Sequence, residues 1–212
     1  GMDYYLDKKT TFGIAFNGFV NPVRRVTNNF ATLRNSTNTI DSTLQSLADR
    51  DGNWYNGSVN LNVTRKIGDK GKEITANIDV IRYNLAAVSN LTNQVFLPNG
   101  TKSTFDELLG DIPATIDIQT AKVDYTQPIK GGNFEAGTKV SFIQTDNTAD
   151  YFDVINGNKK PNYQFSNRFI YQENIAAAYL NFNKEMGKFG IQGGLRYEYT
   201  LSVGDQKGNP LV

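Results

Sequence analysis

Histidine and cysteine, two residues on which many enzyme mechanisms depend, are missing from this chain. Its 212 residues include no histidine and no cysteine, so the imidazole base, the thiolate nucleophile and the usual zinc ligands are absent. Twenty-two basic residues against 21 acidic ones give a formal net charge of +1, and no bulk field attracts nucleic acid. The composition predicts a protein that is not an enzyme and has no cofactor and no nucleic-acid partner.

Two charged clusters could still carry chemistry. Asp146, Asp150 and Asp153 offer the oxygen ligands that calcium prefers, but their spacing matches no EF-hand loop. Arg196 and Glu198 could act as a catalytic dyad, although ordinary ion pairing explains the same two residues. We predict a solvated loop and an ion pair, with no catalytic residues and no metal site.

Four aromatic residues form the candidate ligand site. Tyr151, Phe152, Tyr163 and Phe165 lie in or beside a polar stretch at residues 145–164, and loops commonly carry binding residues. Their rings could stack on a sugar or another ligand at the mouth of a barrel. They could equally pack the loop onto itself or lie in an interfacial aromatic girdle.

Seven segments alternate apolar and polar residues with the period of two that is typical of strands. In residues 188–202, Ile191 and Leu195 share one face, and Gln192 lies on the other. The other six segments are residues 11–17, 58–64, 73–83, 116–127, 134–142 and 168–184. The longest of these segments, at about 11 residues or more, exceed the mode of about 5 to 6 in soluble domains and favour a membrane-spanning sheet.

Two of the seven segments interrupt this alternation. Residues 116–127 change phase near Thr120, and residues 168–184 contain three consecutive alanines at positions 176–178. A β-bulge, which inserts one extra residue into a strand, would explain either interruption.

The connections between these segments alternate between short and long. Short glycine-rich turns are expected near residues 68–72, 131–133 and 187–188, and longer polar loops at residues 85–113 and 145–164. Short turns on one side of the membrane and long loops on the other are typical of transmembrane β-barrels. For residues 22–52, which are rich in Asn, Thr and Ser, we predict two irregular strands around residues 35–38, with a short helix at residues 42–48 as the alternative.

The polar face of the predicted sheet carries many charges. Water in a lumen accommodates such side chains, whereas a dry interior would require a partner for each. They are Lys122, Asp124, Glu135, Lys139, Arg196 and Glu198. The pattern therefore predicts an all-β, antiparallel up-and-down meander of long strands that forms part of a transmembrane β-barrel.

Several strings in the chain resemble the outer-membrane β-barrel family of TonB-dependent receptors in Bacteroidetes. These strings are MDYYL at residues 2–6, KKTTFG at 8–13, SVNLN at 58–62, AKVDYT at 121–126, IYQENI at 170–175 and GGLRYE at 193–198. The resemblance implies a nutrient receptor of the bacterial outer membrane. Such a receptor has a plug domain ahead of a barrel of about 22 strands and an energy-coupling partner at the inner membrane.

The chain departs from that family pattern in strand number and in the absence of a visible plug. We therefore expect residues 1–212 to be a single β domain, an incomplete section of a larger barrel that does not transport by itself. Residues 1–2 resemble a tag-cleavage scar. The section is expected to be open or closed in a non-native way, with outer-membrane lipid, the parent's plug or a second copy of the chain as partners.

A soluble module is the competing interpretation. An eight-stranded lipocalin-like barrel would bind a small apolar ligand and would turn its apolar face inward. The face that is exposed in the folded chain distinguishes the two.

Overall fold

The computed structural model describes residues 1–207, and residues 208–212 of the expected domain lie outside it. The described chain forms ten strands in one sheet. They are β1 (Met2–Tyr5), β2 (Thr10–Arg34), β3 (Ile40–Ile67), β4 (Lys72–Phe96), β5 (Lys102–Asp111), β6 (Ala114–Ile129), β7 (Gly132–Ile155), β8 (Asn158–Pro161), β9 (Asn167–Met186) and β10 (Phe189–Lys207).

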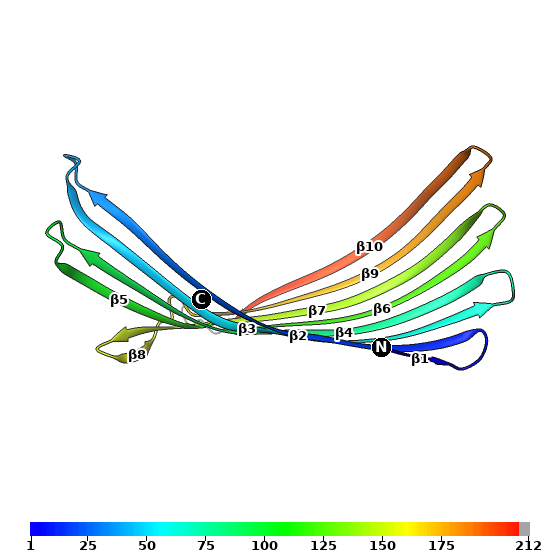
Figure 1. The fold of residues 1–212 in the computed structure, drawn as a ribbon, viewed down its shortest axis with the longest axis horizontal. Helices are drawn as coiled ribbons and strands as arrows, with labels where there is room; N and C mark the ends of the chain where they lie inside the picture. The colour runs from blue at the N-terminus through cyan, green and yellow to red at the C-terminus, as the bar shows by residue number, and fades with distance from the viewer. Residues whose placement is uncertain (208–212) are drawn as a thin grey trace.

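Neighbouring strands are antiparallel and follow chain order across the sheet (Figure 1). β5 and β6 share one position between β4 and β7. Pro113, which separates them, has no N–H to donate, but the Ile112 N–H donates to the Ala87 carbonyl at 2.8 Å and the Thr148 N–H to the Pro113 carbonyl at 3.0 Å. The predicted all-β antiparallel meander is confirmed.

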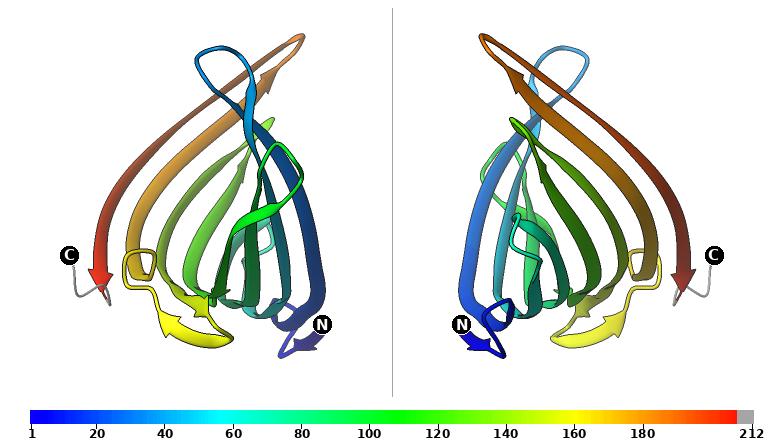
Figure 2. Two further views of the ribbon diagram at one scale, coloured as in Figure 1. Left: turned by 90° about the vertical axis from the view of Figure 1, so that its left-hand side faces the viewer. Right: turned by 90° about the vertical axis from the view of Figure 1, so that its right-hand side faces the viewer.

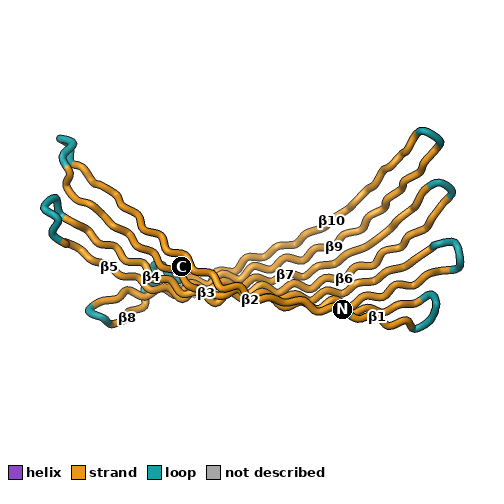
Figure 3. The backbone as a smooth tube through the Cα atoms, in the orientation of Figure 1, coloured by secondary structure: helices purple, strands orange, loops and turns teal. Residues whose placement is uncertain are grey.

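Short turns connect the strands at both ends of the sheet (Figure 3). One end, which we call the short-turn end, carries the connections at residues 6–9, 68–71, 130–131 and 187–188. The opposite end, which we call the far end, carries those at residues 35–39, 97–101 and 156–157. The predicted loops at residues 85–113 and 145–164 were therefore largely wrong, because β4, β5 and β7 continue through most of them. Both faces of these stretches are polar or mixed, so they lack the apolar alternation that indicates a strand.

Residues 22–52 contain strands and no helix, so the strand prediction is confirmed over its helical alternative. They are continuations of β2 and β3 around the turn at residues 35–39, not additional strands. The bulges predicted near Thr120 and at residues 176–178 are absent, because pairing runs without a shift through both places. The register shifts instead between Leu33 and Arg34 and between Gln94 and Phe96.

The sheet is a single curved layer whose edges do not meet (Figure 2). Among the described residues, β1 pairs only with β2 and β10 only with β9. Ala87 and Ala177 are the only buried apolar residues in that part of the chain. The accessible surface is 14626 Å², whereas a compact monomer of this mass exposes about 9,800 Å². The chain by itself leaves a large apolar surface uncovered.

Within residues 1–207, no helix is long and apolar enough to cross a membrane.

Gly131 should be required for the turn between β6 and β7. Its φ is +76°, and a Cβ there would lie 2.9 Å from the Glu185 carbonyl oxygen. We expect Gly131→Ala to lower the free energy of unfolding by about 1–2 kcal/mol, the typical cost of the left-handed conformation for an L-residue. Urea unfolding of the chain in detergent micelles measures this loss. Gly190→Ala is the matched control, since a Cβ there would meet nothing within 4 Å, and equal losses in both variants would contradict the prediction.

Candidate functional site

One face of the sheet carries a continuous apolar band. In register, Ile14, Leu61, Ile78, Ala121 and Val140 form one row of it across β2, β3, β4, β6 and β7. Large side chains in the band are exposed, with Phe142 at 55% and Leu195 at 79%. We call this side of the sheet the apolar face and the opposite side the polar face.

The band has two polar edges. On the far-end side, the Arg82 guanidinium donates to both carboxylate oxygens of Asp117, at 2.6 and 2.8 Å, and Gln172 donates to Gln144 at 2.9 Å in the same row. Lys72 lies at the opposite edge, beside the short turns. Such edges are expected where an apolar medium gives way to water.

The height of the band matches a membrane. Along β7 it extends from Phe134 to Phe142, and the roughly eight steps between these residues, at about 3.4 Å each, span about 27 Å of strand. A tilted strand needs about 9–11 residues to cross a bilayer. β7 therefore has an apolar stretch of the length that a bilayer requires.

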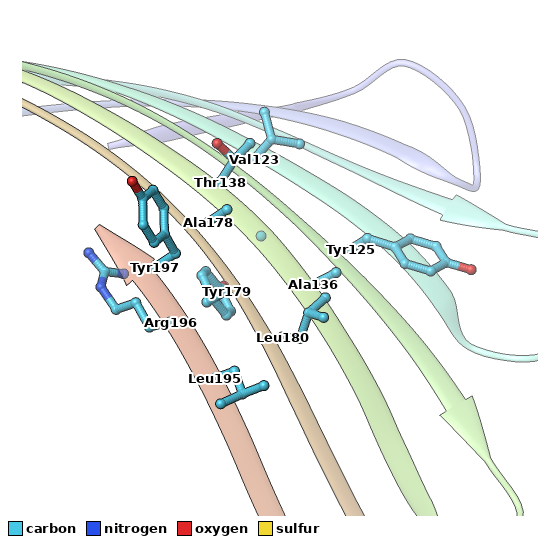
Figure 4. Close-up of a pocket in the computed structure, with 11 residues that line it drawn as sticks. Val123, Tyr125, Ala136, Thr138, Ala178, Tyr179, Leu180, Leu195, Arg196 and Tyr197 are labelled. Atoms are coloured by element: carbon cyan, nitrogen blue, oxygen red, sulfur yellow. The ribbon is translucent and has the colours of Figure 1, made fainter. Parts of the chain in front are cut away.

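A groove of about 750 Å³ runs through the middle of the band (Figure 4). Its floor consists of the small side chains Ala136, Thr138 and Ala178, while Tyr125 and Tyr197 stand on either side. The three consecutive alanines thus have a structural reason without a bulge. Ala178 lies in the groove floor, and Ala177, on the polar face, is only 5% exposed.

The polar face holds a network of hydrogen bonds and ion pairs at the level of the band. Gly137 has no side chain, so the Tyr179 hydroxyl reaches across β7 from β9 and donates to Asp124 on β6. Lys122 pairs with the same carboxylate at 2.8 Å. The ammonium of Lys122 also lies 5.8 Å from the centroid of the Tyr179 ring. Lys122 and Asp124 therefore have their partners on the polar face of the sheet itself.

The same pattern extends along the wall. The Asn60 amide donates to Asp79 at 2.7 Å, and the predicted ion pair of Arg196 and Glu198 is present at 2.6 Å. Ser141 is only 4% exposed and lies 3.1 Å from the Thr120 hydroxyl. Ser141 on this face is thus far less exposed than its neighbour Phe142 on the apolar face, at 55%.

The two faces exchange character at the row of Arg82. Ile81, Ile118 and Ile143 are register partners on the polar face, while Arg82 and Asp117 lie on the apolar face. This exchange is the physical reason for the phase change near Thr120. Outside the membrane, water contacts the apolar face of the sheet, so the apolar side chains in that region lie on the polar face instead.

Only two of the four predicted ligand-contact aromatics come together. Tyr151 of β7 and Phe165 meet edge to face with ring centroids 6.3 Å apart, and both line a hollow of about 570 Å³ on the polar face. Phe152, the neighbour of Tyr151 in β7, points to the opposite face. Tyr163 lies in the connection between β8 and β9 and is 52% exposed. Ligand contact by these residues stays a prediction.

The hollow also contains residues that the sequence analysis missed. Asp106 and Asp153 supply carboxylates to its lining, and Leu91 and Leu108 supply apolar surface. No local motif could have indicated this combination, because β4, β5 and β7 come together only through the sheet register.

The three aspartates considered as calcium ligands do not converge. Asp146 accepts two hydrogen bonds from Arg168, at 2.7 and 3.0 Å, and that guanidinium holds the pKa of Asp146 below its ordinary value. Asp153 lies on the other face and accepts from the Asn162 amide at 2.9 Å. In the part of the chain that the structure describes, no group of three or more acidic side chains could hold a metal ion.

The position of Ile78 provides a direct test of the two faces. Ile78 lies in the centre of the band and is 52% exposed, and Asn77 precedes it on the polar face. We expect Ile78→Arg to lower the free energy of unfolding in lipid vesicles by about 2–4 kcal/mol, the cost of an arginine at the bilayer midplane. Asn77→Arg is the matched control and should cost less than about 1 kcal/mol. Urea titrations monitored by circular dichroism measure both, and similar costs at the two positions would contradict a lipid-facing band.

Comparison with known proteins agrees with this geometry. The sequence model of the outer membrane protein beta-barrel family matches residues 65–211, well over half of the chain. No curated protein matches the chain significantly. The chain therefore belongs to the outer membrane protein beta-barrel family, and its location is the bacterial outer membrane.

Proposed function

We propose that the chain is a barrel section of a TonB-dependent receptor from Bacteroidetes, a protein that imports nutrients across the outer membrane. Family membership supports the barrel, and the resemblance of six sequence strings, from MDYYL at residues 2–6 to GGLRYE at residues 193–198, supports the finer assignment. The section does not transport by itself. The proposal gives it no catalytic role, no cofactor and no nucleic-acid partner.

The observation that carries the proposal is the separation of the two faces. Exposed apolar side chains such as Phe142 and Leu195 suit contact with lipid acyl chains. The opposite face, with Lys122 paired to Asp124 and Arg196 to Glu198, suits the wall of a water-filled lumen. A lipocalin-like barrel would require the reverse arrangement, with its apolar side chains inward, and is not favoured.

The proposed partners follow from what the section leaves uncovered. Outer-membrane lipid covers the apolar face. Further strands of the parent pair with the open edges at β1, β2 and β10, whose unpaired N–H and C=O groups no lipid satisfies. The plug of the parent lies against the polar face and contacts the energy-coupling protein. In the isolated section, a second copy of the chain provides the missing edges.

The gene that encodes the parent protein provides the first test. We expect a signal peptide and a plug domain upstream of this section and about a dozen further strands downstream, since a receptor barrel has about 22 strands. A reading frame without a plug and without further strands would overturn the proposal.

Energy coupling provides the second test. Deletion of the parent gene should abolish growth on one or more nutrients, and deletion of the energy-coupling gene should abolish growth on the same ones. The parent restored on a plasmid should recover growth only in cells that retain the coupling protein. A passive pore would support equal growth in both backgrounds, and that outcome would contradict a TonB-dependent receptor while leaving the outer-membrane barrel intact.

A further inference from the structure

A hollow of about 260 Å³ lies on the polar face, between β2, β3 and β4 and beyond the membrane band. Arg25 and Arg50 line one side of it. The register places these two arginines directly opposite each other across β2 and β3. Side chains in that relation have Cβ atoms about 4.5–5.5 Å apart, and like charges so placed destabilise a sheet.

Neither arginine has a compensating partner in residues 1–207. No hydrogen bond and no ion pair joins either guanidinium to a described residue. The six other arginines of the chain all form ion pairs or side-chain hydrogen bonds, which sets Arg25 and Arg50 apart: Arg24, Arg34, Arg65, Arg82, Arg168 and Arg196.

The aspartates beside Arg50 in sequence cannot serve it. Asp49 and Asp51 flank Arg50 on β3, and strand alternation places both on the apolar face. There Arg24 donates to both oxygens of Asp49, at 2.8 and 3.3 Å. These hydrogen bonds hold the pKa of Asp49 below its ordinary value, so its negative charge is committed to the other side of the sheet.

The rest of the hollow is shaped for an apolar group. Gly52 and Ala87 are register partners at its base, and both are buried. A Cβ on Gly52 would lie 2.9 Å from the Ala87 Cβ, so the base has no room for a side chain there. Trp54 of β3 and Leu85 of β4 are register partners and form the wall opposite the arginines. At about 3.3 Å per residue, Trp54 lies about 13 Å along β3 from Arg50.

We propose that this hollow binds a small organic anion, with a carboxylate or phosphate group held by Arg25 and Arg50 and an apolar or aromatic body against Trp54 and Leu85. The planar guanidinium fork matches the oxygens of both anionic groups. An anion between the two arginines also removes the like-charge repulsion that the empty wall carries. The volume limits the ligand to about the size of a single substituted ring.

The proposal concerns binding, and only the role of the anion as imported cargo rests on the proposed receptor function. A binding measurement therefore tests the site even where transport is not energy-coupled. Conversely, failure of the binding test would leave the receptor assignment untouched.

Trp54 is the only tryptophan in the chain, so its fluorescence reports on this hollow alone. Phenyl phosphate, benzoate and inorganic phosphate are titrated separately into the full chain in detergent micelles. We expect a saturable change in Trp54 emission with phenyl phosphate or benzoate, and weaker binding of inorganic phosphate, which lacks the apolar body. Arg25→Gln and Arg50→Gln should each weaken binding at least tenfold, and Arg50→Lys should weaken it less than Arg50→Gln.

Arg24→Gln is the matched control. Arg24 is the chain neighbour of Arg25 but points to the opposite face, so its loss should leave the affinity unchanged within about twofold. Circular dichroism of each variant confirms that the sheet has formed. The absence of a saturable response to all three probes, or an equal loss of affinity in Arg24→Gln and Arg25→Gln, would overturn the proposal.

Discussion

The ladder of hydrogen bonds between antiparallel strands is the interaction on which the rest of this structure depends. A single-layer sheet has no interior, and among the described residues only Ala87 and Ala177 are buried apolar residues. Packing of a hydrophobic core cannot hold such a chain together. Backbone pairing between neighbouring strands does so instead, and it is strongest where no water competes for the N–H and C=O groups, as in a bilayer. The apolar band and the ladder are therefore mutually dependent, because the lipid that covers the band also protects the hydrogen bonds beneath it.

The row that contains Arg82 and Asp117 shows how closely the side chains follow the surrounding medium. On the membrane side of this row, Val80 and Phe142 are exposed on the apolar face. Two residues further along the strand, Arg82 and Asp117 form a bidentate ion pair on that same face, and the isoleucines lie on the inner one. The sheet itself continues without a break in pairing. The kind of side chain on each face therefore changes because the surrounding medium changes along the strand, while the strand itself and its pairing continue.

This continuity explains which parts of the fold the sequence could predict. Residues 134–142 and 188–202 alternate because one face meets an apolar medium and the other meets water, and both were predicted as strands. Residues 85–113 are also mostly strand, but both of their faces are polar or mixed, so only the hydrogen-bond ladder shows that they pair. For the same reason, the four candidate aromatics could be named from composition, whereas the meeting of Tyr151 with Phe165 depends on the connection between β8 and β9.

The register shift at the tip of the β2–β3 hairpin has a consequence for charges further along these two strands. At the tip of the hairpin Arg34 pairs with Ile40. From Leu33 back toward the start of β2, each residue pairs with a β3 residue one position later than the register at the tip would give. Without that displacement Arg25 would lie opposite Asp49 and would have a carboxylate partner on its own face. The observed register instead places Arg25 opposite Arg50 and leaves Asp49 to Arg24 on the outer face. Because the side-chain period of a strand is two, a shift of one residue changes both the partner and the face that partner occupies. A single irregularity in the β2–β3 hairpin therefore concentrates uncompensated positive charge on the inner wall, where an anion is the partner that satisfies it.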